Sequence, residues 1–98
     1  MEYSFSAVLW EWTSKTSWYF LSLPHAEADD IDARFGRNAP GFGSIRVEVV
    51  IGDTTWRTSI FPSSAQKTYV LPVKKAVRAA ERLAPGSIAV VQLSIVSE

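Results

Sequence analysis

The sequence predicts a mainly β protein: a small β-barrel of about six strands with two short α-helices. Stretches in which apolar and polar residues alternate with a period of two recur along the chain, and two other stretches show helical spacing. Clusters of Pro, Gly, Asn and Ser separate these stretches and mark turns. Because closure hides the edges of a small sheet, a barrel is favoured over an open sheet. With 98 residues, the chain predicts a single domain, residues 1–98.

Composition narrows the class of protein. A hydrophobic fraction of 47% and an aromatic fraction of 12% favour a packed core over disorder. The absence of cysteine excludes disulfides and thiolate zinc sites. No signal peptide and no apolar run long enough to cross a bilayer is present, so we expect a cytoplasmic protein with no membrane partner.

The N-terminal part predicts a β-hairpin. Residues 3–10 alternate with a period of two, which predicts a strand with one face toward the core. Residues 17–23 are dense in β-formers and end at Pro24, which predicts the return strand. Antiparallel pairing of these strands predicts a small area rich in aromatic rings, made by Trp10, Trp12, Trp18 and Tyr19.

The middle of the chain predicts a helix, a loop and a second hairpin. Pro24 begins a helix of about three turns that ends near Gly36 and carries acidic residues in its early turns. Residues 37–43 are rich in Gly, Pro and Asn, and we expect a mobile loop there. A strand over residues 45–51 turns back at Gly52-Asp53, and we expect its partner, residues 54–61, to end at Pro62.

The C-terminal part predicts a short strand, a cationic helix and a final strand. The short strand covers Lys67 to Leu71. Pro72 is suited to begin a helix and Pro85-Gly86 to end it, so we expect a helix from about Val73 to Leu83. Its outer face is cationic, with Lys74, Lys75, Arg78 and Arg82. Ile88 to Val96 is almost continuously apolar, which predicts a strand covered on both faces.

Charge is distributed unevenly although the formal net charge is zero. Residues 1–49 hold seven acidic and four basic residues, whereas residues 50–98 hold three acidic and six basic residues. Three interpretations stay open: solvated faces, attraction between the two helices within or between subunits, and a basic face for an anionic partner. Solvated faces are the favoured interpretation, because charge patterns usually serve solubility.

A series of motifs covers nearly the whole chain in a fixed order: Phe5-Ser6-Ala7, residues 18–24 (WYFLSLP), Ile45-Arg46-Val47, Gly52, residues 56–62 (WRTSIFP), residues 69–78 (YVLPVKKAVR) and Gly86. In this order the motifs resemble the domain of unknown function 1905 family. The resemblance implies a small β-barrel related to the double-split barrels, a group that also includes swapped-hairpin transcription regulators and antitoxins. In some bacterial proteins it implies a neighbouring domain linked to bacteriocin protection, and it implies no established activity. Many relatives carry Gly-Asp before the last strand, where this chain has Gly86-Ser87.

Five residues are candidates for binding an anion. Arg57 is placed on a strand either to hold a carboxylate or phosphate with two hydrogen bonds, or to pair with Glu48 across the hairpin, which is the favoured interpretation. Near the start of the cationic helix, four more residues could converge on one anion: Lys67, Tyr69, Lys74 and Arg78. The alternative, which is favoured, is that Lys74 and Arg78 project into water.

Metal binding and catalysis have little support in the sequence. His25 is the only histidine, and the acidic residues near it lack the spacing of a metal site. No serine lies in a nucleophile-elbow motif, Gly-x-Ser-x-Gly. No acidic residue and base are spaced as a pair for general acid–base catalysis. We therefore expect no catalytic residues, no metal and no cofactor. The tryptophans are expected mainly in the core, although Trp10 and Trp12, if exposed, are suited to stack on bases or sugars.

These observations favour a non-catalytic module that binds a small anionic ligand through Arg57, Lys67, Tyr69, Lys74 and Arg78. The alternative is a nucleic-acid-binding or regulatory protein, by analogy with other double-split barrels, with a homodimer left open. Fold analogy is a weak argument for function. A pI near 6.6 and zero net charge also count against nucleic acid as the partner.

Overall fold

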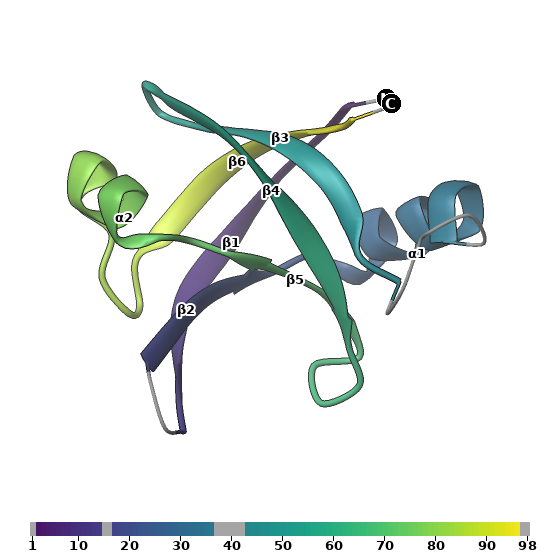
Figure 1. Cartoon of the computed structure of the whole chain (residues 1–98), viewed down its shortest axis with the longest axis horizontal. Helices are drawn as coiled ribbons and strands as arrows, with labels where there is room; N and C mark the ends of the chain where they lie inside the picture. The colour runs from purple at the N-terminus through teal and green to yellow at the C-terminus, as the bar shows by residue number, and fades with distance from the viewer. Residues whose placement is uncertain (1, 15–16, 37–42, 97–98) are drawn as a thin grey trace.

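The structure is a computed structural model that describes residues 2–14, 17–36 and 43–96. The elements follow in the order β1 (Glu2–Thr13), β2 (Ser17–Ser22), α1 (His25–Phe35), β3 (Ile45–Ile51), β4 (Thr54–Ser63), β5 (Thr68–Pro72), α2 (Lys75–Glu81) and β6 (Ile88–Ile95). The six strands form a closed antiparallel barrel in the order β1-β2-β5-β4-β3-β6 (Figure 1). This confirms the predicted mainly β barrel with two helices. Of the predicted mobile loop at residues 37–43, all but Gly43 lies outside the described residues.

Two strands change partners partway along their length. The first part of β1, Glu2–Val8, pairs with β6, and the second part, Leu9–Thr13, pairs with β2. In the same way β4 pairs with β3 over Thr54–Ile60 and with β5 over Phe61–Ser63. The barrel therefore consists of two sheets that share β1 and β4, and β4 separates from β5 after the first few paired residues.

The core lies inside the barrel and follows the predicted alternation along β1, β3 and β4. On β4, for example, Trp56 and Ile60 point inward while Arg57 and Phe61 are exposed. The large side chains that are fully buried come from all six strands and both helices: Leu9, Leu21, Leu23, Ile31, Val47, Val49, Ile60, Leu71, Val77, Val91 and Leu93.

The helices lie on opposite sides of the barrel (Figure 1). Because α1 carries the acidic residues and α2 the basic ones, this placement excludes attraction between them within one chain. Helix α1 ends at Gly36 as predicted and buries Ala28 and Ile31. In the part of the chain that the structure describes, neither helix is long and apolar enough to cross a membrane.

Helix α2 is shorter than the predicted span from Val73 to Leu83. At its start, the backbone N–H of Val73 donates to the carbonyl of Tyr19, so Val73 continues the strand-like path along β2. At its end, Arg82 adopts a left-handed conformation with φ 56° and ψ 46°, and the N–H of Leu83 donates to the carbonyl of Arg78. This hydrogen bond, together with the left-handed residue, forms a Schellman-type cap that ends the helix before Pro85.

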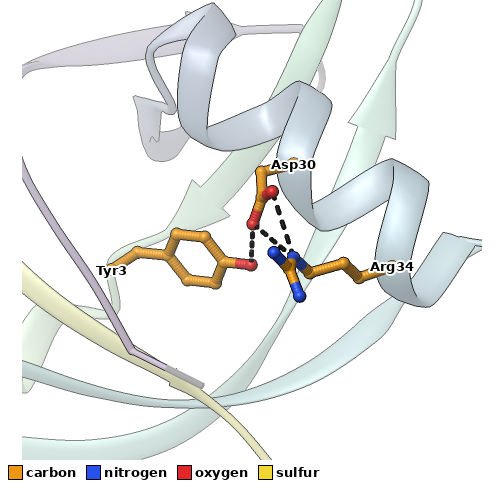
Figure 2. Close-up of polar contacts among 3 residues, drawn as sticks. All are labelled: Tyr3, Asp30 and Arg34. Carbon is orange, nitrogen blue, oxygen red and sulfur yellow. Dashed lines mark hydrogen bonds and ion pairs between the residues drawn. The ribbon is translucent and has the colours of Figure 1, made fainter.

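Helix α1 is held against the barrel by two tyrosines. Tyr3 of β1 donates from its hydroxyl to Oδ2 of Asp30 at 2.7 Å, and Nε of Arg34 donates to both oxygens of Asp30 at 3.0 Å (Figure 2). Tyr69 of β5 donates to Oδ1 of Asp32 at 3.2 Å. Two carboxylates of one helix are thus bound to two strands that are far apart in the sequence.

The hairpin of β3 and β4 holds the C-terminal end of helix α2. Glu81 accepts a hydrogen bond from the hydroxyl of Thr54 at 2.6 Å, and its carboxylate lies against Gly52. Gly52 has φ 57°, a conformation that glycine adopts without the steric cost of a side chain. The predicted two-residue turn at Gly52-Asp53 is confirmed, with Ile51 paired to Thr54.

The predicted end of β4 at Pro62 is wrong. The strand continues through Pro62, which pairs with Tyr69, and ends at Ser63. Beyond Ile60 the ladder with β3 has stopped, so β4 has a single partner strand in this stretch. A proline can be accommodated there because one edge of the strand needs no N–H donor.

The prediction that both faces of the last strand are covered is also wrong. Burial alternates along β6, and the outward residues Ile88 and Val90 are 69% and 67% exposed. The inward face of β6 carries the buried residues Ala89, Val91 and Leu93. The outward face is also apolar at Ile88 and Val90, but no other described element covers it.

The tryptophans divide between core and surface. Trp56 is buried, as predicted, and Trp10 is half-buried. Trp12 and Trp18 face each other across the β1–β2 hairpin and are each 50% exposed, so the expectation that they lie in the core is wrong. Tyr19 pairs with Glu11 and points to the opposite face of the hairpin, away from these rings.

Candidate ligand-binding site

Three of the five predicted binding residues lie together on one pocket of about 390 Å³, here called the cationic pocket. Arg57 comes from β4, Lys74 precedes α2, and Arg78 lies on α2. Among the described residues, the lining contains no acidic side chain and consists of Ser17, Trp18, Tyr19, Trp56, Arg57, Thr58, Pro72, Val73, Lys74 and Arg78.

The pocket lies where β4 and β5 have separated. Their ladder stops at Phe61 and Val70, while β5 continues along β2 as far as Pro72. The stretch of β4 around Arg57 therefore has β3 on one side and the pocket on the other. The start of β2 and the start of α2 form the remaining walls, so the change of partner along β4 creates the pocket.

Arg78 is held in place by its neighbours and does not simply project into water. Its Nε donates to the carbonyl of Val73 at 3.1 Å, and its guanidinium carbon lies 3.6 Å from the centre of the Tyr19 ring. Such a cation–π contact contributes about 0.5–1 kcal/mol at an exposed site. The planar group is therefore already oriented before any ligand arrives, which lowers the entropic cost of binding.

Arg57 makes the predicted cross-strand pair with Glu48. The two residues are in register, and Nε of Arg57 lies 3.3 Å from Oε2 of Glu48. Both side chains are well exposed, at 60% and 42%. Exposed pairs of this kind contribute about 0–1 kcal/mol, so an anion in the pocket can compete with Glu48 for the guanidinium.

Lys74 is exposed and has an extended backbone, with φ −70° and ψ 162°, immediately before α2. It is the most mobile type of cation, a point charge at the end of a flexible stem. With Lys74 and the two arginines, the pocket has three cationic side chains. They come from β4, from α2 and from the link between β5 and α2.

The structure does not bring Lys67 and Tyr69 together with Lys74 and Arg78. Lys67 and Tyr69 line a different pocket of about 470 Å³ between α1 and the β4–β5 turn, which also contains Asp29 and Asp32. Burial, followed by the charge of Asp32 and the hydrogen bond to it, raises the pKa of Tyr69 to about 12. The neutral phenol there is a donor to Asp32, and an added anion would face two carboxylates.

Aromatic residues of the cationic pocket were not among the predicted site residues. Trp18, Tyr19 and Trp56 surround the three cations, and they come from strands that pair with different neighbours. The dense aromatic content of residues 17–20 was visible in the sequence. These aromatic residues lie opposite Arg57 because β2 and β4 are on either side of β5. The periodicity of a sequence does not reveal the order of strands in a sheet.

Within residues 2–14, 17–36 and 43–96, no group of three or more His, Cys, Asp or Glu side chains is placed to hold a metal ion. The chemical capacity of the cationic pocket is instead that of two guanidinium groups and one ammonium group. These supply hydrogen-bond donors and positive charge, beside aromatic rings that can contact an apolar part of a ligand.

Comparison with protein families gives a match to this chain. A family model described as "Domain of unknown function (DUF1905)" matches residues 5–93, nearly the whole chain. The match includes all of β2 through α2 and most of β1 and β6. No curated protein matches the chain.

Proposed function

Because the chain belongs to the family described as Domain of unknown function (DUF1905), whose description names no activity, we propose a function from the geometry of the site. The protein is a non-catalytic module that binds a small anionic or amphipathic ligand in the cationic pocket. The observation that carries this proposal is the gathering of Arg57, Lys74 and Arg78 on one pocket whose described lining includes no acid. Lys67 and Tyr69 fall outside the proposed site.

The lining supports a ligand with two parts. The guanidinium groups of Arg57 and Arg78 suit a carboxylate or phosphate, because their planar donors match such oxygens. Trp18 and Trp56, with Pro72 and Val73, offer apolar contact to the rest of the ligand. A volume of about 390 Å³ is within the range of about 300–1,000 Å³ that small-molecule sites occupy.

The alternative partner is a nucleic acid. Trp18 is half exposed beside the cations, and bases stack on exposed aromatic rings near positive charge. The division of β1 and β4 between two partner strands also supports the resemblance to double-split barrels, some of which are regulators. Salt dependence separates the two candidates, because nucleic-acid binding releases counterions in proportion to the phosphates contacted.

Thermal denaturation with added probes tests the proposal. The probes are inorganic phosphate, citrate, adenosine triphosphate, indole-3-acetate and a short thymidine oligonucleotide, each at two salt concentrations. A ligand that binds only the folded state stabilises it by about 2.7 kcal/mol at 100 times its Kd. We expect a small anion to raise the melting temperature at both salt concentrations.

A double variant, Arg57→Ala with Lys74→Ala, should abolish this shift and leave the unliganded melting temperature nearly unchanged, because both side chains are exposed. Lys75→Ala is the matched control for the lysine change, since it removes one positive charge from the first residue of α2, which does not line the pocket. A shift that persists in the double variant, or no shift with any small anion, would rule out the cationic pocket as the site. A shift with the oligonucleotide alone, lost at high salt, would favour nucleic acid.

A further inference from the structure

A further concave surface lies on the outside of the barrel and shares no lining residue with the cationic pocket. It has a volume of about 420 Å³ and is here called the aromatic groove. The outer face of the β1–β2 hairpin forms one side, and the turn between β4 and β5 forms the other. Its lining residues are Trp10, Trp12, Phe20, Pro62, Ser63, Ser64, Ala65, Gln66 and Val70.

The hairpin side of the groove is a row of aromatic rings in contact with one another. Trp10 is in register with Phe20, and their ring centres are 5.2 Å apart at an angle of 38°. Phe20 continues to Trp18, which is 6.0 Å away and nearly parallel at 8°. Trp12 faces Trp18 across the ladder, and both are 50% exposed. The outer face thus presents flat apolar rings to solvent at the spacing of the strands.

The turn side of the groove is polar and is fixed relative to the rings. Nε1 of Trp10 donates to the hydroxyl of Ser22 at 2.9 Å, and that hydroxyl lies 3.4 Å from Oε1 of Gln66. The backbone N–H of Gln66 donates to Oγ of Ser63 at 3.2 Å. With Oε1 of Gln66 directed to Ser22, its amide NH₂ is the group left to donate to a ligand, and the hydroxyls of Ser63 and Ser64 add further capacity.

Among the described residues that line the groove none is charged, unlike the linings of the two pockets described above. The cationic pocket has three cations, and the pocket beside α1 has Asp29, Asp32 and Lys67. The described lining therefore offers a nucleic acid or other polyanion no cation to balance its phosphates. An uncharged ligand with an apolar face and many hydroxyls matches both sides of the groove.

We propose that the aromatic groove binds an uncharged carbohydrate. The C–H face of a sugar ring lies against the rings of Trp10 and Trp12, where it covers apolar surface that is otherwise in water. The hydroxyls at the rim of the sugar bond to Gln66, Ser63 and Ser64 on the turn. Phe20 of the groove stacks on the half-exposed Trp18, so the aromatic surface continues beyond the groove and suits a chain of sugar rings.

Intrinsic tryptophan fluorescence and calorimetry with cellohexaose, maltohexaose and chitohexaose test this inference. We expect at least one of these oligosaccharides to change the fluorescence in a saturable manner. Trp12→Ala should weaken that binding about tenfold or more, because it removes a stacking ring. Gln66→Ala should weaken it by a smaller factor, because it removes one hydrogen-bond donor.

Matched controls keep the result specific to the groove. Ile88→Ala removes another exposed apolar side chain that does not line the groove, and it should bind as the unaltered protein does. The Arg57→Ala, Lys74→Ala variant should also bind the oligosaccharide normally, so failure of the cationic pocket and failure of the groove are distinguishable. Circular dichroism verifies that Trp12→Ala remains folded, as its 50% exposure leads us to expect.

Four outcomes would overturn the inference. The first is no saturable signal from any of the three oligosaccharides. The second is equal binding by the unaltered protein and Trp12→Ala. The third is a thymidine oligonucleotide that binds in a Trp12-dependent manner and more tightly than any of the three oligosaccharides. The fourth is a dimer in solution that dissociates on Trp12→Ala, since a second copy would then be what covers the groove.

Discussion

Arg82 ends α2 in a backbone conformation that costs an ordinary L-residue free energy. Its φ of 56° lies in the left-handed region, which glycine adopts without a clash between Cβ and the following carbonyl. Arg82→Gly should therefore raise the free energy of unfolding by about 1 kcal/mol. For a domain of this size that corresponds to a melting temperature roughly 4–8 °C higher, measurable by thermal denaturation.

Arg82→Ala is the control for this prediction. It removes the same cation and keeps the Cβ atom, so it should not give the gain seen with glycine. Equal melting temperatures for the glycine and alanine variants would show that the left-handed conformation is not strained. Lys67, with φ 57°, is a second position at which the same comparison applies.

Individual contacts differed in how far the sequence could predict them. The pair of Glu48 and Arg57 follows from a two-residue turn, because the turn fixes the register of the hairpin on both sides. The contact of Arg78 with Tyr19 joins α2 to a strand almost sixty residues earlier. No local rule sets that distance, so the sequence alone suggested that Arg78 would lie in water.

At the scale of an element, α1 depends on polar contacts with two strands. Its apolar face is small, with Ala28 and Ile31 as its buried residues. The hydrogen bond from Tyr3 and the ion pair with Arg34 hold the pKa of Asp30 below its ordinary value, so that carboxylate is charged at neutral pH. Its stabilising contribution is present above its ordinary pKa and is lost as the pH falls through the lowered one.

Tyr3→Phe should loosen α1 while leaving the barrel intact. The variant loses one hydrogen bond, which typically contributes about 0.5–1.5 kcal/mol, and keeps the buried ring. Hydrogen exchange should therefore accelerate at the amides of α1 more than at those of β3 and β6. Arg34→Ala, which removes only an exposed contact within the helix, is expected to have a smaller effect. Uniform acceleration across the chain would contradict this account.

The observed bounds of a helix agree with the predicted ones where only local signals determine its ends. Helix α1 has a proline before it and a glycine after it, and its observed bounds agree with the prediction. Helix α2 had similar signals at Pro72 and Pro85-Gly86, yet a hydrogen bond to β2 and a left-handed Arg82 shortened it from both sides. Tertiary contacts, which a local pattern does not contain, decided those ends.

For the whole molecule, two tyrosines make stability sensitive to alkaline pH. Burial, then hydrogen bonding to Asp30, raises the pKa of Tyr3 from 10.0 to about 12, and Tyr69 is raised to about 12 beside Asp32. A folded-state pKa above the unfolded value stabilises the fold fully below pH 10. That stabilisation is lost as the pH rises toward 12, so the melting temperature should fall over this interval.

A double variant, Tyr3→Phe with Tyr69→Phe, checks the origin of this pH dependence. Without the two phenol groups, the melting temperature should be lower at neutral pH and should change less between pH 10 and 12. Tyrosinate absorbance in the unaltered protein should show Tyr3 and Tyr69 ionising near pH 12 and not near pH 10. An unchanged slope in the double variant would assign the alkaline transition to other groups.

The pairing of the strands within the barrel is the feature that the sequence predicted least completely. Alternation with a period of two gives each strand an inward and an outward face, whichever strand lies beside it. It therefore predicted the buried residues of β1, β3 and β4, but not the points at which β1 and β4 change partners. The cationic pocket exists because β4 leaves β5, so its residues were predicted individually while their grouping was not.

The ladder between β1 and β6 has a consequence for how the chain is made. It joins Glu2 to Ser94 and Val8 to Ile88, so this part of β1 cannot pair until β6, about eighty to ninety residues later, has been made. Bringing such distant strands together reduces the entropy of the intervening chain before the stabilising contacts form, and this slows folding. Until β6 has been made, the free edge of β1 is open to pairing with other chains, so the nascent chain should depend on chaperones during this interval.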